Sequence, residues 1–315
     1  MAVGEPRNPG PSWGLRTIDW WDAHLPTPLR DAAVAIGGAV AYWIMPGQRA
    51  ASREYLSAIL GRPATHREGI RHFAEFTHGL LAKLRAGDRV NTHIDWADQT
   101  NRERGKILFS DESILLGTFH VGASDLMGFH VSQNGRGISM IRQRVANSDD
   151  IDRLLARSGD NVEIIWVNEA SEIVFALKES LEAGKSIAMQ CDRVEHASKT
   201  EGFDFLGAQR EFPVTIYRLA CLYGRPVQFY VALPQGDSRD DFDVFCSELF
   251  RPTGQRQTDR DAAHAHFQGV LVWLEGLLRE QPYQWFNFLP LNPVWTADTN
   301  APCRRSAQTP PSDAT

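Results

Sequence analysis

The feature that most constrains the fold of this sequence is a change of pattern after Asp88, where short apolar runs of strand-forming residues begin to alternate with helical segments. Such alternation is typical of an α/β protein whose helices cover both faces of one sheet. We expect strands over 113–119, 137–142, 162–167, 186–191, 226–233 and 242–249, and helices over 124–131, 150–157, 171–183, 213–223 and 260–279. The pattern therefore predicts a mixed sheet flanked by helices.

The part of the chain before Asp88 has a different character. Apolar residues recur at helical spacing over 53–60 and 67–84, and Gly87 follows the second run as a stop signal. The tail is rich in Pro, Ser and Thr, a composition typical of disorder. We predict a disordered N-terminus over 1–12, a helical extension over 13–87, one α/β domain over 88–300 and a disordered tail over 301–315.

An apolar run over residues 32–45 is the strongest candidate for contact with a membrane. It is shorter than the roughly 20 residues that a spanning helix needs. Aromatic and basic side chains nearby suit the depth of lipid headgroups, namely Trp20, Trp21, Tyr42, Trp43, Arg30, Arg49 and Arg53. The run is either an interfacial helix or a buried core helix, and the sequence leaves both interpretations open.

Composition and charge exclude several classes of function. The net charge of −6 does not provide the broad basic surface of a nucleic-acid binder. The four cysteines are widely spaced without a C-x-x-C pair, so we expect reduced thiols and no zinc or redox site. The first twelve residues lack the basic and apolar regions of a secretory signal, and we therefore expect a cytoplasmic protein.

The most informative segment is an apolar strand that runs into a glycine-containing turn and delivers His120 to the end of the strand. Open α/β sheets bind ligands beyond the carboxyl ends of their strands. A neutral imidazole there can take a proton from a hydroxyl, and Asp125, in the next helical turn, could hold the ring in the right tautomer. Ser124 lacks the second glycine of a G-x-S-x-G nucleophile turn.

The H-x-x-x-x-D pattern after an apolar strand resembles the signature of the lysophospholipid acyltransferase superfamily. The blocks 186–193, 205–208, 213–220 and 225–227 resemble the lipid A biosynthesis branch in order and spacing. The block 282–288, Pro-Tyr-Gln-Trp-Phe-Asn-Phe, resembles a bacterial subgroup of predicted acyltransferases, in which Glu is common at the position of Asp125.

The resemblance implies an acyltransferase with His120 and Asp125 as the catalytic pair. It would move a fatty acyl chain from the thioester of acyl carrier protein or coenzyme A to a hydroxyl of a lipid or glycolipid. The acceptor hydroxyl would attack directly, without an acyl-enzyme and without a metal or redox cofactor. The expected location is peripheral, on the cytoplasmic face of the bacterial inner membrane.

Several residues are candidates for binding the substrates. Asp192 and Arg193 follow a buried strand and would share the sheet edge of His120, where they contact the acceptor or form a surface ion pair. Arg142 ends another strand and could meet the phosphate of phosphopantetheine or the acidic surface of acyl carrier protein. The further candidates, from the block at 205–208 and just after it, are Phe205, Gly207 and Arg210, the last of which is otherwise a solvated loop residue.

Three aromatic residues of the last block, Trp285, Phe286 and Phe288, are expected to fill the core or the acyl groove. The histidines at 66, 72 and 78 lie on different faces of one helix, so we expect packing or solvated side chains rather than a metal site. Two other functions stay open. In a thioesterase or lipid hydrolase His120 would activate water, and in a non-catalytic lipid-binding protein its replacement would change no lipid.

Overall fold

The computed structural model describes most of the chain between residues 17 and 292. The described residues are 17, 20–21, 24–87, 93–124, 128, 131, 135–142, 162–167, 173–194, 197, 199–236, 238 and 240–292. The helix expected over 150–157 and the termini 1–12 and 301–315 lie outside these ranges. Of the helix expected over 124–131, the structure describes Gly128 and Val131 as helical.

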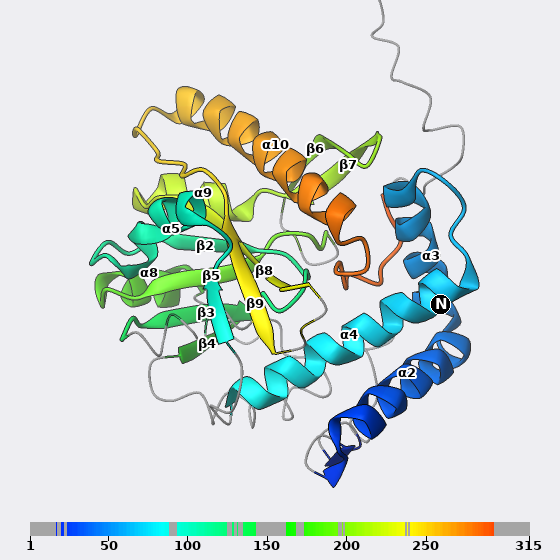
Figure 1. The fold of residues 1–315 in the computed structure, drawn as a ribbon. Coiled ribbons are helices and arrows are strands. Elements are labelled where there is room, and N and C mark those ends of the chain that lie inside the picture. Colours follow the sequence, from blue (N-terminus) through cyan, green and yellow to red (C-terminus); the bar gives the residue numbers. More distant parts are fainter. Residues whose placement is uncertain are drawn as a thin grey trace, which may run out of the picture.

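One mixed sheet of seven strands forms the centre of the fold, in the order β1-β9-β8-β2-β5-β3-β4 (Figure 1). Five neighbouring strands, from β8 to β4, are parallel, whereas β9 is antiparallel to β8 and pairs in parallel with the edge strand β1. The strands are β1 His93–Trp96, β2 Leu115–Thr118, β3 Ile138–Arg142, β4 Val162–Trp166, β5 Ser186–Gln190, β8 Val227–Pro234 and β9 Asp241–Cys246. The predicted mixed α/β architecture is confirmed.

Helices cover both faces of this sheet because successive strand residues point to opposite sides. Leu115 belongs to a core shared with α8 Ile173–Glu182, α9 Thr215–Tyr223 and α10 Arg256–Glu280. Leu116 points the other way, into a second core with Leu108. Leu108 lies in the short helix η1 Gly105–Phe109, which follows α5 Gln99–Arg104.

A two-stranded hairpin, β6 Thr200–Phe205 and β7 Ala208–Pro213, was not expected from the sequence. It lies beside α10, which contacts β6 (Figure 1). The prediction that a helix begins at Pro213 is wrong, because this residue ends β7 and α9 begins at Thr215. Proline is tolerated at a strand terminus, where no ladder hydrogen bond is needed from its nitrogen.

The helices α2 Thr27–Ile44, α3 Pro46–Leu60 and α4 His66–Gly87 precede the sheet in the described part of the chain, and they confirm the predicted helical extension. Figure 1 shows α2 at the outer side of α4, away from the sheet. The two helices approach closely at Gly38, where a Cβ would come within 2.9 Å of the backbone nitrogen of Ala74. None of the helices in the described ranges has both the length and the apolarity needed to cross a bilayer.

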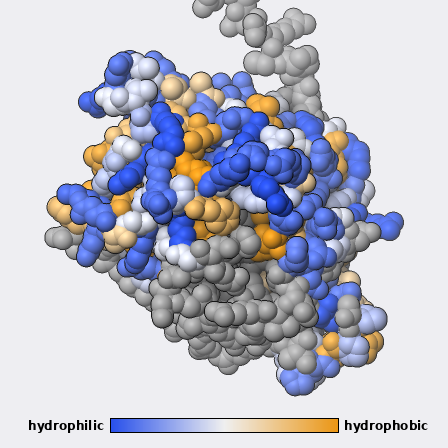
Figure 2. All heavy atoms as spheres, turned by 60° about the vertical axis from the view of Figure 1, so that its left-hand side comes forward, coloured by the Kyte–Doolittle hydropathy of each residue, from blue (hydrophilic) through white to orange (hydrophobic). Residues whose placement is uncertain are grey.

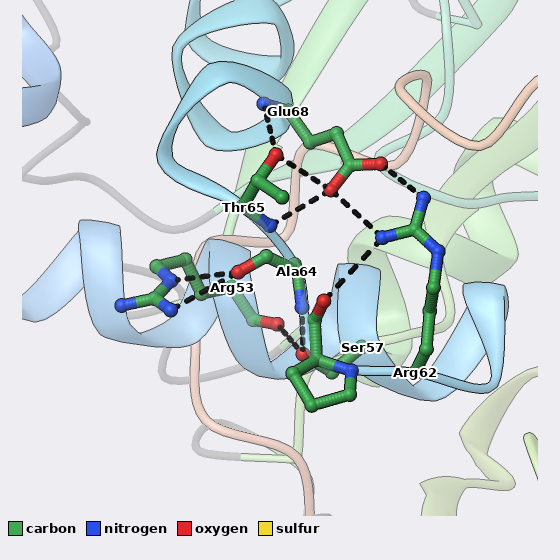
Figure 3. Close-up of polar contacts among 7 residues, drawn as sticks. Arg53, Ser57, Arg62, Ala64, Thr65 and Glu68 are labelled. Carbon is green, nitrogen blue, oxygen red and sulfur yellow. Dashed lines mark hydrogen bonds and ion pairs between the residues drawn. The ribbon is translucent and has the colours of Figure 1, made fainter.

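Polar side chains hold the junction between α3 and α4 (Figure 3). The hydroxyl of Thr65 accepts from the backbone nitrogen of Glu68, whose carboxylate accepts in turn from Thr65, a reciprocal capping box. The hydrogen bond from Arg62 lowers the pKa of Glu68 to about 2. Arg53 on α3 donates twice to the carbonyl of Ala64. These contacts set the angle between α3 and α4.

Candidate active site

The sheet register brings two predicted site residues together. In the parallel pair of β2 and β5, Thr118 lies opposite Gln190. His120 and Asp192 each follow two residues later, so they meet at the carboxyl edge of the sheet, where α/β proteins bind ligands. Nδ1 of His120 lies 2.7 Å from Oδ1 of Asp192, and the backbone nitrogen of His120 donates to Oδ2 at 2.9 Å.

Asp192 is a buried and ionised partner for the imidazole. Its side chain has no exposed surface, and its Oδ2 also accepts from the indole nitrogen of Trp285 at 2.7 Å. Burial alone would raise the pKa of Asp192, but the charge and hydrogen bond of His120 together with the Trp285 bond hold it below its ordinary value. The carboxylate thereby keeps the proton of His120 on Nδ1, which makes Nε2 the basic nitrogen.

Backbone hydrogen bonds to the segment 284–286 fix the main chain at His120. The backbone nitrogen of Phe286 donates to the carbonyl of His120 at 2.6 Å, and Gly122 donates to the carbonyl of Gln284 at 2.7 Å. Gly122 has φ +52°, and a Cβ there would lie 2.2 Å from the carbonyl oxygen of Ala232. Only glycine fits this position. The imidazole remains 18% exposed, so a substrate can reach it.

A mainly apolar pocket borders the carboxyl ends of β2 and β5. Thr118 and Gln190, two residues before His120 and Asp192, lie in its wall, and Arg142 at the end of β3 also borders it. Its apolar lining comes from Leu108, Leu116, Val131, Met140, Ala188 and Tyr230. Its apolar lining and its position two residues before the pair make this pocket a candidate for contact with the acyl chain.

The remaining predicted residues lie elsewhere. Arg193 donates to the side chain and to the carbonyl of Asn287, at 3.2 and 3.3 Å. Asp125 lies outside the described residues, so its role stays a prediction. Neither neighbouring nucleophile is suited to form an acyl-enzyme. Ser124 is buried and donates to the carbonyl of Val121, whereas burial and the charge of Asp192 raise the pKa of the Cys191 thiol.

Phe205, Gly207 and Arg210 belong to the β6–β7 hairpin. The interpretation of Arg210 as a solvated loop residue is wrong, because it is 2% exposed and donates to the carbonyls of Phe205 and Leu206 at 2.9 and 3.4 Å. Its guanidinium thus supplies hydrogen-bond donors to the carbonyls of this turn. The ring of Phe205 packs edge-on against Trp285, with centroids 5.6 Å apart. A role for these residues in substrate binding stays a prediction.

Two contacts of the candidate site were not predicted from the sequence. The prediction placed Asp192 on the right edge of the sheet but did not pair it with His120, and it treated Trp285 as an apolar plug. For the contact between His120 and Asp192, the available signal was that each residue lies two positions after the end of its strand. That signal is readable only when β2 and β5 are known to be neighbours.

His72 on α4 links the helical extension to this site. It is 1% exposed, its Nε2 donates to the carbonyl of Trp285, and its Nδ1 accepts from the hydroxyl of Ser52, both at 2.8 Å. Because a carbonyl can only accept, the proton of the neutral ring is on Nε2. Burial lowers the pKa of His72 from 6.5 to about 4, against the opposing effect of the Trp285 carbonyl.

We therefore predict a loss of stability in mild acid. The unfolded chain binds the His72 proton more tightly than the folded one, so the free energy of unfolding should fall as the pH decreases from 6.5 to about 4. The total loss from this residue is about 3 kcal/mol. Urea unfolding at several pH values should show a shallower pH dependence for His72→Gln. An equally steep dependence in the variant would contradict a neutral buried His72.

The fold is an α/β sheet that carries a histidine–aspartate pair at its carboxyl edge, an arrangement suited to general-base chemistry. The sequence model of the bacterial lipid A biosynthesis acyltransferases matches residues 13–291, which is most of the chain and includes the helical extension. The chain therefore belongs to this family, and it is an acyltransferase that acts on lipid. No curated protein matches it.

Proposed function

We propose that the protein transfers a fatty acyl chain from the thioester of acyl carrier protein or coenzyme A to a hydroxyl of a lipid or glycolipid, with His120 as the general base. The observation that carries this proposal is the His120–Asp192 pair at the carboxyl edge of the sheet, next to an apolar pocket. The matched family supports the acyl transfer itself.

The residues support a single displacement through a tetrahedral intermediate. Nε2 of His120 takes the proton of the acceptor hydroxyl as its oxygen bonds to the thioester carbonyl carbon. Asp192 stabilises the imidazolium that forms. The carbon–sulfur bond then breaks, and the imidazolium returns the proton to the leaving thiolate. A hydroxyl needs such a base more than an amine does, so the expected product is an ester.

The pocket suggests how the donor is placed. Its apolar lining would hold the acyl chain, and Arg142 at its border could pair with the phosphate of the donor arm. Acyl carrier protein is acidic and this chain has a net charge of −6, so docking requires a local basic surface. Arg142 is one residue of such a surface. We expect Asp125 to contribute to the activity as the acidic member of the H-x-x-x-x-D pattern.

The acceptor can be identified in cells by comparative lipid mass spectrometry. Strains carrying the intact protein or His120→Ala should differ in one acylated lipid, whose mass gives both acceptor and chain length. If the only difference were free fatty acid, the enzyme would be a hydrolase. If equal expression gave identical lipids, the proposed transfer would be wrong and a non-catalytic lipid-binding protein would be favoured.

The outer side of α2 supports attachment to a membrane surface. Its inner side packs into the protein through Val34, Gly38 and Tyr42. Its outer side exposes more than half of each of five large apolar residues, Leu29, Ile36, Val40, Trp43 and Ile44. The face seen in Figure 2 mixes hydrophilic side chains with apolar ones. We infer that α2 lies in the headgroup layer of the cytoplasmic face of the inner membrane, without spanning it.

This attachment predicts a loss of vesicle binding when the outer side of α2 is made polar. Combined Ile36→Ser, Val40→Ser and Trp43→Ser should weaken binding to phosphatidylglycerol-containing vesicles at least about tenfold, because each buried apolar side chain contributes on the order of 1 kcal/mol or more. High salt should release only part of the intact protein. The matched control is Leu222→Ser with Val272→Ser, which are equally exposed on α9 and α10. Equal binding by both variants would contradict the assignment.

A further inference from the structure

The buried carboxylate of Asp192 is fixed by a third group besides the side chain and backbone of His120. The indole nitrogen of Trp285 donates to Oδ2, the oxygen that also accepts from the backbone nitrogen of His120. Oδ1 is thereby turned toward Nδ1 of the imidazole. Without the indole, Oδ2 would keep one donor fewer in a site without water-exposed surface, which is costly for a carboxylate.

The indole itself is held rigidly. Tyr55 on α3 meets the Trp285 ring edge-on with centroids 4.9 Å apart, and Phe205 of the hairpin does so at 5.6 Å. These perpendicular contacts fix the plane of the ring, because aromatic pairs favour such edge-to-face geometry. In this orientation the Nε1–H bond points at Asp192.

The backbone of Trp285 is held by the helical extension. Its carbonyl accepts from Nε2 of His72 on α4, and His72 in turn accepts from Ser52 on α3. On either side of Trp285, Gln284 and Phe286 bond to the backbone of Gly122 and His120. The segment 284–286 thus connects α3 and α4 to both His120 and Asp192.

We propose that Trp285 is a positioning residue for the His120–Asp192 pair, and that His72 holds Trp285 in place from the helical extension. This inference rests on the proposed function, in which His120 is the base. Neither residue touches the reacting atoms in this scheme. Their contribution is to keep the carboxylate ionised and aimed at Nδ1, which fixes the tautomer that leaves Nε2 basic.

The test compares Trp285→Phe with Trp273→Phe. The first variant keeps an aromatic ring but loses the N–H, and the second makes the same change in α10, where Trp273 packs on the same core without contacting Asp192. With palmitoyl-coenzyme A as the probe, Trp285→Phe should lower kcat about 10- to 100-fold, as expected for a lost hydrogen bond to a charged group. The KM for the donor should stay unchanged, and Trp273→Phe should keep the wild-type kcat.

A spectroscopic measurement separates this inference from the proposed function. In protein labelled with nitrogen-15 histidine, the Nδ1–H proton signal of His120, identified by its loss in His120→Ala, should move in Trp285→Phe and stay in Trp273→Phe. This readout needs no activity, so it tests the contact even if no acyl transfer occurs. An unmoved signal together with wild-type kcat in Trp285→Phe would overturn the proposal.

A second variant covers the case in which Trp285→Phe does not fold. His72→Leu removes the donor to the Trp285 carbonyl, whereas His72→Gln supplies an amide that can both donate and accept. His72→Leu should lower kcat and shift the His120 Nδ1–H signal without changing the KM, and His72→Gln should restore part of both. A folded His72→Leu protein with wild-type kcat and an unshifted signal would contradict the role of His72.

Discussion

Replacing His120 with alanine is expected to lower kcat for acyl transfer by about 10²–10⁴-fold or more, the usual contribution of a general base. The physical reason is that Nε2 alone takes the proton of the acceptor hydroxyl. The main chain at His120 is held by Phe286, but the variant leaves Oδ1 of the buried Asp192 without its donor, so we expect a folded protein with reduced stability. Initial rates with a labelled acyl thioester, at matched protein concentration and circular dichroism, measure the effect.

Two further variants make this result interpretable. His120→Gln can still donate to Asp192 but cannot act as a base, so it should be as inactive as His120→Ala. His264→Ala removes an exposed histidine of α10 that is remote from Asp192 and should keep the wild-type rate. Transfer at the wild-type rate by a folded His120→Ala protein would exclude general-base catalysis by this residue.

The second large effect is expected for Asp192→Asn. The amide has nearly the same shape, but its NH₂ group cannot accept the Nδ1–H of His120, so the ring would take the other tautomer and present a protonated Nε2. The corresponding change in a serine-protease triad, where it lowers kcat about 10⁴-fold, sets the scale, and we expect about 10²–10⁴-fold here. The loss should lie in kcat, because Asp192 is buried and does not reach the donor.

Asp125→Asn is the matched comparison for this prediction. The H-x-x-x-x-D pattern predicts that it keeps the fold and lowers the rate, whereas the hydrogen bond at Nδ1 predicts that Asp192 matters more. Steady-state rates of both variants, purified side by side, decide between the two acids. A wild-type rate in Asp192→Asn with a large loss in Asp125→Asn would assign the partner role to Asp125.

Local pattern was sufficient to predict the strand that carries His120. An apolar run bounded by a turn marks β2 and β5 almost to the residue, and the position after a strand marks the candidate base. The partner could not be predicted in the same way. His120 and Asp192 are 72 positions apart, and their pairing depends on β5 lying beside β2, which is a property of the whole sheet.

Other differences between the predicted and the observed elements also have specific physical causes. The edge strand β1 is short and alternates between exposed and half-buried residues, so it carries little apolar signal. The strand β7 ends in a proline, a residue that also suits the first turn of a helix. The start of the next helix was therefore predicted too early. The helix α2 is apolar nearly all round, and periodicity cannot say which side of such a helix is packed.

The role of the Trp285 indole nitrogen could not be predicted from the sequence for a different reason. Its aromatic neighbours predict burial, and it is 3% exposed, so the expectation of a plug in the core was sound. The polar end of an indole is functional only when an acceptor is known to lie beside it. That acceptor, Asp192, comes from a strand far away in the sequence.

In the proposed reaction, the chain passes an acyl group directly from a thioester to a lipid hydroxyl with His120 as the base. The most direct test incubates purified protein with isotope-labelled palmitoyl-acyl carrier protein or palmitoyl-coenzyme A and a bacterial membrane lipid extract, followed by lipid mass spectrometry. We predict label in one base-labile ester of a lipid, and none with His120→Ala. Label found only in free fatty acid, or equal ester formation by His120→Ala, would contradict the account.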